Sequence, residues 1–377
     1  MFTAKKSRFV VSVLILLFAL AGVSIAKERS HSGEHDNTFG EKGKKVLSGN
    51  KLDIVLDVAV DEAGDLHVLW MEPSGYVLRK LGPDGNEKSM VTIPAGYLDP
   101  AALTAVGNKI YIVVQRVSDA KNGIFILSQD HGGAISPFIP IDYTGYFDPN
   151  EEQMKFHSLA GKIFLSSMAD DPATGSNSMK VGQLNLETGE VSLLYQKDIA
   201  SFLGGLTAEG INIMSVNPQL DGTVFLLLLK NHNEFYLSRL TKELDALDTT
   251  FGVNGLLPLA GIGLFVGSHG VRPPMIVQQS DGKMIFIGEA ATGSARHILV
   301  HRFLADGAPD TSFGTNGIFK ETFGGGNAIL HSAVLDRRGG LLIFGEVGPE
   351  ENLPPPPPPP ANMRQVPTQN HPLGDAA

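Results

Sequence analysis

Short glycine turns recur along the chain and divide it into units of similar size. One such turn follows the first predicted strand of each unit, with glycine at positions 64, 107, 161, 222, 282 and 339. Successive glycines lie 43, 54, 61, 60 and 57 residues apart. Each turn lies between two apolar or β-branched runs, which is the pattern of a β-hairpin. Hairpins repeated at this spacing indicate a repeat protein.

Each of the first five units continues with a third predicted strand, and most add a fourth, more polar one. In the first unit these strands cover residues 76–81 and 90–93. The second strands are continuous apolar runs, as expected of strands buried between sheets. The pattern predicts an all-β fold, a β-propeller of about six four-stranded antiparallel blades with the last blade incomplete. A pair of β-sandwiches with chance spacing is the alternative.

Two nearly identical octets lie 62 residues apart and begin at Asp248 and Asp310. We interpret them as structural turns, in which the aspartate and a Thr or Ser side chain cap the backbone. Phe251 and Phe313 would anchor the turns on a blade. The octet glycines would adopt backbone angles that other residues avoid; they are Gly252, Gly255, Gly314 and Gly317. The alternative is that the aspartates bind a metal.

The two octets and the segment 280–288 between them resemble the delta-60 repeat of exported bacterial β-propeller-like proteins. A weaker copy of the octet covers residues 36–43, and the resemblance is good over roughly residues 220–345. It implies a propeller fold and an export route. It implies no activity, because that family has no well-defined chemistry.

The N-terminus has the pattern of a secretory signal peptide over residues 1–26. Basic residues precede an apolar run from Phe9 to about Val23, and Ser24-Ile25-Ala26 supplies the small residues of a cleavage site. We therefore expect an exported protein, periplasmic or extracellular, that begins at Lys27. The alternative is an uncleaved N-terminal anchor. After cleavage no remaining segment is long and apolar enough to span a bilayer.

The two ends of the predicted propeller domain, residues 51–348, are expected to meet. The sixth unit runs out of strands after Val347, because a run of seven prolines begins at Pro354 in a tail, residues 349–377, that we expect to be disordered. The N-terminal segment 27–50 holds a candidate closing strand at residues 43–48. Pairing of that strand with the last blade would remove an exposed sheet edge.

Composition excludes several classes of function. The chain has no cysteine, which rules out disulfides, thiolate metal sites and cysteine nucleophiles. Loss of residues 1–26 removes three basic residues and leaves 27 basic and 40 acidic, a net charge of −13. Such a surface repels phosphate, so we expect no nucleic-acid partner. No phosphate loop, dinucleotide fingerprint or zinc-protease motif is present, and we expect no cofactor and no metal. His297 and His301 are expected at the surface.

The topology predicts one binding face. Loops from the second to the third strand and from the fourth strand to the next blade share it, at the mouth of the channel. The candidate ligand-binding residues on these loops are Asp170, Asp171, His232, His269 and Arg272. The leading hypothesis is an exported, non-enzymatic binding protein for an unknown protein, small molecule or glycan. The alternative is a propeller enzyme of the lactonase, lyase or glycosidase type that acts at the channel mouth.

Overall fold

The computed structural model describes most of the chain between residues 10 and 348. The described residues are 10–12, 22–29, 34–35, 39, 44–46, 54–130, 132, 135–143, 147, 154–170, 177–199, 203, 211–230, 234–259, 266–267, 270–271, 274–292, 295–321, 327–337 and 339–348. The predicted tail, residues 349–377, lies outside them. No helix in the described part of the chain is long and apolar enough to cross a membrane.

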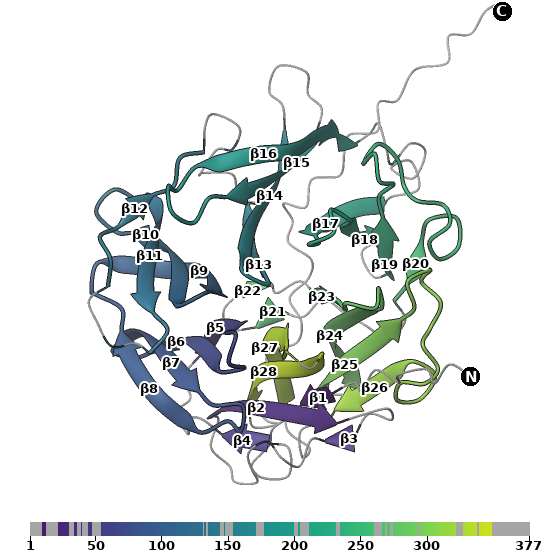
Figure 1. Cartoon of the computed structure of the whole chain (residues 1–377). Coiled ribbons are helices and arrows are strands. Elements are labelled where there is room, and N and C mark those ends of the chain that lie inside the picture. Colours follow the sequence, from purple (N-terminus) through teal and green to yellow (C-terminus); the bar gives the residue numbers. More distant parts are fainter. Residues whose placement is uncertain are drawn as a thin grey trace, which may run out of the picture.

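Five four-stranded antiparallel sheets are arranged as the blades of a β-propeller (Figure 1). Blade 1 contains β5 (Ile54–Val60), β6 (Leu66–Glu72), β7 (Gly75–Leu81) and β8 (Glu87–Thr92). Blade 2 contains β9 (Tyr97–Val106), β10 (Lys109–Arg116), β11 (Asn122–Ser128) and β12 (Ile139–Pro140). Blade 3 contains β13 (Lys155–Leu159), β14 (Lys162–Asp170), β15 (Asn177–Leu184) and β16 (Val191–Asp198). Blade 4 contains β17 (Ile211–Pro218), β18 (Val224–Lys230), β19 (Glu234–Arg239) and β20 (Leu257–Pro258). Blade 5 contains β23 (Met275–Gln278), β24 (Met284–Thr292), β25 (Ala295–Phe303) and β26 (Ile318–Glu321).

The sixth unit is a hairpin, so the structure has five regular blades where the sequence predicts about six. The hairpin consists of β27 (Asn327–Leu335) and β28 (Gly340–Gly348). N-terminal strands extend it into a six-stranded sheet; they are β1 (Val10–Ser12), β2 (Gly22–Arg29), β3 (Glu34–His35) and β4 (Lys44–Val46). The count differs because the chain supplies two strands of the sixth repeat before residue 349.

The N-terminal strands that pair with β28 are β1 and β2, which corrects the prediction that residues 43–48 fill this place. β2 pairs antiparallel with β28, with Gly22 opposite Val347 and Lys27 opposite Leu342. β4 pairs with the other edge of β2 and is therefore one strand removed from β28. The predicted cleavage point after Ala26 falls inside β2. The sequence did not suggest this strand because residues 22–26 are the end of the predicted signal peptide.

The turns between first and second strands adopt the left-handed backbone that only glycine takes without strain. Gly64 has a φ of +84° and Gly222 a φ of +87°. In the first turn the Gly64 N–H donates to the carbonyl of Asp61, 3.0 Å away. The hairpin spacing in the sequence therefore corresponds to the geometry of the blades.

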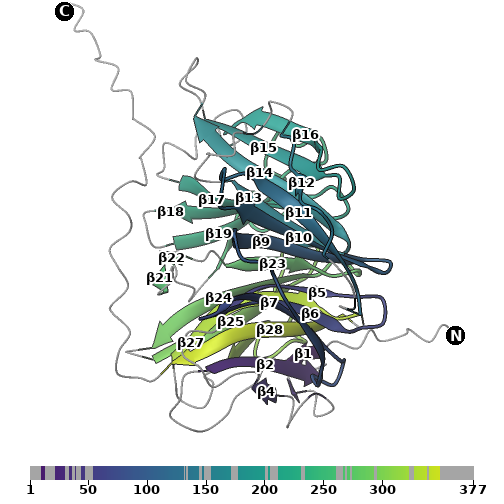
Figure 2. The same ribbon diagram turned by 90° about the vertical axis from the view of Figure 1, so that its left-hand side faces the viewer.

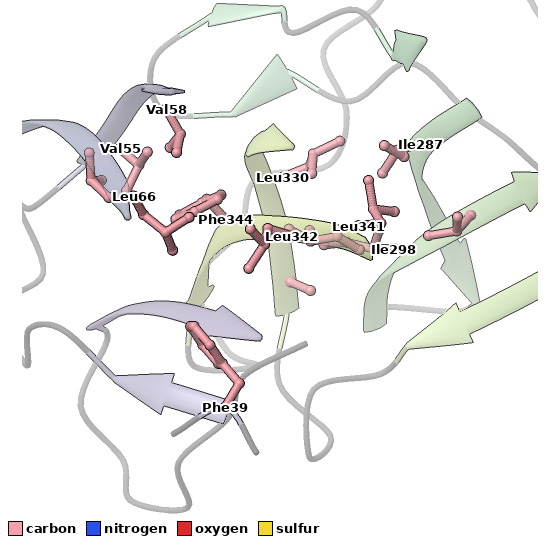
Figure 3. Close-up of a cluster of buried hydrophobic side chains, with 14 of the residues drawn as sticks. Phe39, Val55, Val58, Leu66, Ile287, Ile298, Leu330, Leu341, Leu342 and Phe344 are labelled. Carbon is pink, nitrogen blue, oxygen red and sulfur yellow. The ribbon is translucent and has the colours of Figure 1, made fainter. Parts of the chain in front are cut away.

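Each neighbouring pair of units encloses an apolar cluster. The largest joins blade 1, blade 5 and the β27–β28 hairpin and includes Val55, Ile298 and Phe344 (Figure 3). Phe39, from the weak octet, is fully buried in this cluster. A Cβ added at Gly85 in blade 1 would lie 2.9 Å from the Phe39 ring. The N-terminal segment thus packs against blade 1 through Phe39, which has the same position in its octet as Phe251 and Phe313 have in theirs.

Both complete octets form capped turns between a third and a fourth strand. The Asp248 carboxylate accepts hydrogen bonds from the Thr250 N–H at 3.0 Å and the Thr250 hydroxyl at 2.5 Å. Asp310 holds Ser312 in the same way. Phe251 and Phe313 are fully buried. The octet glycines all have positive φ.

An arginine on the third strand completes each octet. Arg239 donates to Asp248 at 2.9 and 2.7 Å and its guanidinium lies 5.0 Å from the centroid of the Phe251 ring. Arg302 repeats this arrangement, 2.9 Å from the Asp310 carboxylate and 4.5 Å from the Phe313 ring. The aspartate of the repeat therefore binds an arginine of its own blade, and the arginine covers the anchoring aromatic ring.

The expected surface position of His297 and His301 is wrong, since both side chains are 4% exposed. They lie on β25, which is packed between neighbouring units. The His301 ring stacks on Phe303 and meets Phe286 edge-on. Burial lowers the pKa of His301 to about 4, so this imidazole is neutral at physiological pH.

Candidate functional site

A cavity of about 950 Å³ lies where the first strands of the units meet. Its walls come from β5, β9, β13, β17, β23 and β27, so residues from every unit of the ring face it. The short hairpin formed by β21 (Val266–Gly267) and β22 (Gly270–Val271) appears at the centre of the ring in Figure 1 and toward one side of the molecule in Figure 2. The cavity is the central channel of the propeller.

Bulges in the first strands shape the wall of this channel. Register shifts occur between Val55 and Asp57, between Ile213 and Ser215, and between Leu330 and Ser332. The extra residues are Leu56, Met214 and His331, of which Leu56 and His331 line the cavity. A bulge re-aims the side chains next to it. Repetition of the bulge turns residues from separate blades toward one space.

Asp57 is a buried carboxylate on the channel wall that connects three blades. It accepts hydrogen bonds from the Val58 N–H at 2.8 Å, the Leu103 N–H at 2.7 Å and the Ser158 hydroxyl at 3.0 Å. Burial raises the pKa of Asp57 to about 6, and the three hydrogen bonds oppose that rise. This carboxylate thus joins the inner strands of blades 1, 2 and 3 and titrates near neutral pH.

Glu289 has a comparable position on the opposite part of the ring. Its carboxylate accepts the Leu330 N–H at 2.7 Å, which connects blade 5 to the last hairpin. The Arg296 guanidinium lies 4.0 Å from the same carboxylate. Asp57 and Glu289 are therefore each held by groups of the protein.

His157 and Ser166 of blade 3 form a polar contact that Ser166 extends to blade 4. The His157 Nε2 lies 2.7 Å from the Ser166 Oγ, and that hydroxyl donates to the Val216 carbonyl at 3.3 Å. Because the hydroxyl hydrogen is directed at Val216, the Ser166 oxygen accepts from Nε2–H of the imidazole. Burial, with the nearby charge of Lys155, lowers the pKa of His157 to about 3. His157 is therefore a neutral hydrogen-bonding group in the channel wall.

Uncharged polar side chains occupy the neighbouring wall. Ser215 and Asn217 of β17 line the cavity, and the Asn217 amide donates to the Ser215 hydroxyl at 2.8 Å. Lys155, at the start of β13, contributes an ammonium that donates to the Met214 carbonyl, 3.5 Å away. The channel can therefore offer hydroxyl, amide and ammonium groups to a bound molecule. Within the described ranges no three His, Asp or Glu side chains are grouped so as to hold a metal ion.

The site residues expected from the sequence cannot be placed by their side chains. Asp170 ends β14, where its backbone pairs with Asn177, and its side chain lies outside the described part. Asp171, His232, His269 and Arg272 lie outside the described residues. The β21–β22 hairpin flanks His269 in the sequence and lies at the ring centre, on the predicted inter-blade connection.

Comparison with known proteins agrees with the propeller architecture. Residues 279–313 match the family model of a β-propeller domain of unknown function, DUF5122. This match covers the blade 5 hairpin and the start of the second complete octet. No curated protein matches the chain significantly.

Solved structures similar to this chain have low sequence identity. A protein of unknown function from Bacteroides caccae is 11% identical, covers 74% of this chain and 85% of its own, and gives a TM-score of 0.40. The endo-arabinase from Bacteroides thetaiotaomicron is 16% identical over 64% of this chain and 87% of its own, with a TM-score of 0.37. TolB from Acinetobacter baumannii is 12% identical over 80% of this chain and 62% of its own, with a TM-score of 0.45.

Sequence reasoning missed the residues that line the channel. Asp57 carried a usable signal, since it is a charged residue inside the apolar strand Ile54–Val60. A buried charge in such a strand requires partners, which marks it as unusual. Lys155 and His157 gave no such signal, because most residues of β13 are polar and a charged or polar side chain is not unusual there.

Proposed function

We propose that this protein is an exported, non-enzymatic β-propeller that binds a small molecule in its central channel. We further propose that it belongs with the delta-60 repeat proteins, since the octets and the turn between them support that membership. Export rests on the signal-peptide pattern of residues 1–26. Placement of the ligand rests on the cavity.

The observation that carries the proposal is a cavity of about 950 Å³ in which polar side chains lie among the mostly apolar residues of the inner strands. Small-molecule sites in proteins are typically concave spaces of about 300–1,000 Å³ with a few convergent polar groups. Asp57 and Glu289 serve to join neighbouring blades, which favours a rigid binding wall over a pair of reacting groups.

The binding proposal is tested by native mass spectrometry of the protein isolated from the exported fraction. We expect a bound small molecule on the wild type and its loss from Asn217→Trp, which places an indole in the channel. Lys162→Met, an exposed substitution on β14 outside the cavity, should retain the molecule. A wild type without bound mass, or equal binding by Asn217→Trp, contradicts the proposal.

Export is tested on the same material by N-terminal sequencing. Protein from the envelope or the medium should begin at Lys27. Intact Met1 on protein recovered from the cytosol contradicts export.

Catalysis in the channel is a second candidate, favoured by one observation. The pKa of Asp57 is raised to about 6, and acids with such a pKa in a cavity are typical of general acid–base catalysts. Turnover of chromogenic glycosides or lactones that disappears in Asp57→Asn, while the fold is retained, would establish this function. Absence of turnover by the wild type between about pH 4 and 8 would reject it for those substrates.

A further inference from the structure

Lys155 is a partly buried cation of the channel wall without an ion pair among the described residues, whereas Arg337, which also lines the cavity, is exposed. Its ammonium lies 3.5 Å from the Met214 carbonyl, at the limit of a hydrogen bond. No described carboxylate forms an ion pair with it. The side chain is partly buried and lines the cavity. Burial lowers the pKa of Lys155 because the charged form is poorly solvated there.

The described acids that line the cavity are Asp57, Glu62, Glu289 and Asp336, and none of them forms an ion pair with Lys155. The two oxygens of Asp57 are occupied by Val58, Leu103 and Ser158. Glu289 is held by Leu330 and lies near Arg296. His157, on the same face of β13, is neutral and bonded to Ser166. An ammonium in such surroundings is costly unless an anion accompanies it.

We propose that the ligand of the channel carries one carboxylate, which pairs with the Lys155 ammonium. This inference rests on the proposed function, because it assigns a chemical class to the molecule bound in the same cavity. A single ammonium balances a single negative charge. A doubly charged phosphate would leave net charge in a poorly solvated space, so a carboxylate fits better than a phosphate.

The rest of the ligand is polar and uncharged. Ser215, Asn217 and His157 line the same cavity as Lys155 and contribute hydroxyl, amide and imidazole groups. Such groups hydrogen-bond to alcohols and do not attract a second charge. A sugar acid has both features: its carboxylate would pair with the Lys155 ammonium, and its hydroxyl groups would form hydrogen bonds with the uncharged polar side chains of the wall.

Isothermal titration with galacturonate, galactose and inorganic phosphate tests this assignment on the full chain. We expect galacturonate to bind the wild type at least about tenfold more tightly than galactose or phosphate, the range for a charge-assisted hydrogen bond. Lys155→Met should weaken galacturonate by at least about tenfold, and Lys155→Arg should retain most of the affinity. Lys162→Met, exposed on the same blade, is the matched control and should leave affinity unchanged.

The outcomes separate this inference from the proposed function. Equal binding of galactose and galacturonate, or unchanged affinity in Lys155→Met, overturns the carboxylate pairing and leaves a channel ligand site in place. Tighter binding of phosphate overturns the choice of anion. Absence of galacturonate binding by a folded wild type overturns the sugar-acid assignment. Lys155→Met should fold, because methionine preserves most of the side-chain volume, and an unchanged melting temperature verifies this.

Discussion

The repeat of this protein depends on three side chains that act together in each complete octet. An aspartate caps the turn, an arginine of the third strand binds the aspartate, and the arginine covers a fully buried phenylalanine. The sequence revealed the aspartate, the phenylalanine and the glycines because they are adjacent. It did not reveal Arg239 or Arg302, which lie 9 and 8 residues before the aspartates and become neighbours through strand pairing.

The anchoring role of the octet aromatics can be measured within one turn. Phe251→Ala removes a fully buried ring and should lower the free energy of unfolding by about 3 kcal/mol or more. Val253→Ala alters a side chain of the same octet that is 71% exposed, and should change stability by less than about 0.5 kcal/mol. Chemical denaturation of both variants gives the comparison. Equal effects would mean that the octet is an exposed recognition motif.

Buried His157 should make the protein sensitive to acid. Its pKa is about 3 in the folded protein against 6.5 in the unfolded chain, so below pH 6.5 the unfolded state binds more protons. Stability from this group is therefore complete above pH 6.5 and decreases as the pH falls toward 3. As the pH falls, the unfolding free energy of His157→Gln should decrease less steeply than that of the wild type. The two slopes should differ by up to about 1.4 kcal/mol per pH unit.

The contribution of Asp57 to stability has the opposite sign. Its raised pKa means that the folded state binds the proton more tightly between pH 3.8 and about 6. Comparison of wild type with His157→Gln at each pH cancels this term, because both proteins contain Asp57. Parallel curves of unfolding free energy against pH would contradict the assignment for His157.

At the scale of the element, the glycine turns and the order of the strands could be predicted from local sequence. The N-terminal strands could not. Hairpin turns require positive φ at one residue, and that requirement is visible as glycine. The place of β2 depends on an edge that exists after the ring has formed, so no local pattern indicates it. The same reason hides the channel site, whose residues come from all units of the chain, from Leu56 to His331, and converge through the bulges.

The Phe39 ring should hold the N-terminal segment against blade 1 by packing on Gly85. Gly85→Ala combines an unfavourable φ of +82° with a Cβ placed 2.9 Å from the Phe39 ring. Gly222→Ala is the matched control, since its φ is +87° and no atom lies within 4 Å of its Cβ. Both should lose about 1 kcal/mol from the backbone, and Gly85→Ala a further 1–3 kcal/mol or so from overpacking. Identical losses in denaturant titrations would contradict the contact.

β2 should contribute to the stability of the last sheet. Residues 22–26 provide five of the six residue pairs between β2 and β28, and Lys27 provides the sixth. A chain that begins at Lys27 should therefore melt lower than one that begins at Gly22, by roughly 5 °C, because the edge of β28 becomes exposed. Thermal unfolding of the two chains measures the difference. Equal melting temperatures would show that β2 is dispensable.

At the scale of the whole molecule, the protein is a ring whose two ends form one sheet, around a channel lined by apolar and polar side chains. The largest apolar cluster contains residues from blade 1, blade 5, the last hairpin and the N-terminal segment. The sequence predicted a propeller and a meeting of the ends, because an incomplete last repeat leaves an edge to be covered. The predicted number of regular blades was too high, because the two strands of the sixth unit have the pattern of the first two strands of a complete blade.

The most direct test of this closure is a disulfide between the ends of the uncleaved chain, because the cleavage proposed for export would remove Val23. Val23 and Glu346 are paired across β2 and β28, and the wild type has no cysteine to interfere. The Val23→Cys, Glu346→Cys variant should form an intramolecular disulfide in the monomer under mild oxidation. A control with Val23→Cys and Glu243→Cys, the latter exposed in the loop after β19, should not. Intermolecular disulfides alone, or equal crosslinking in the two variants, would contradict the closed ring.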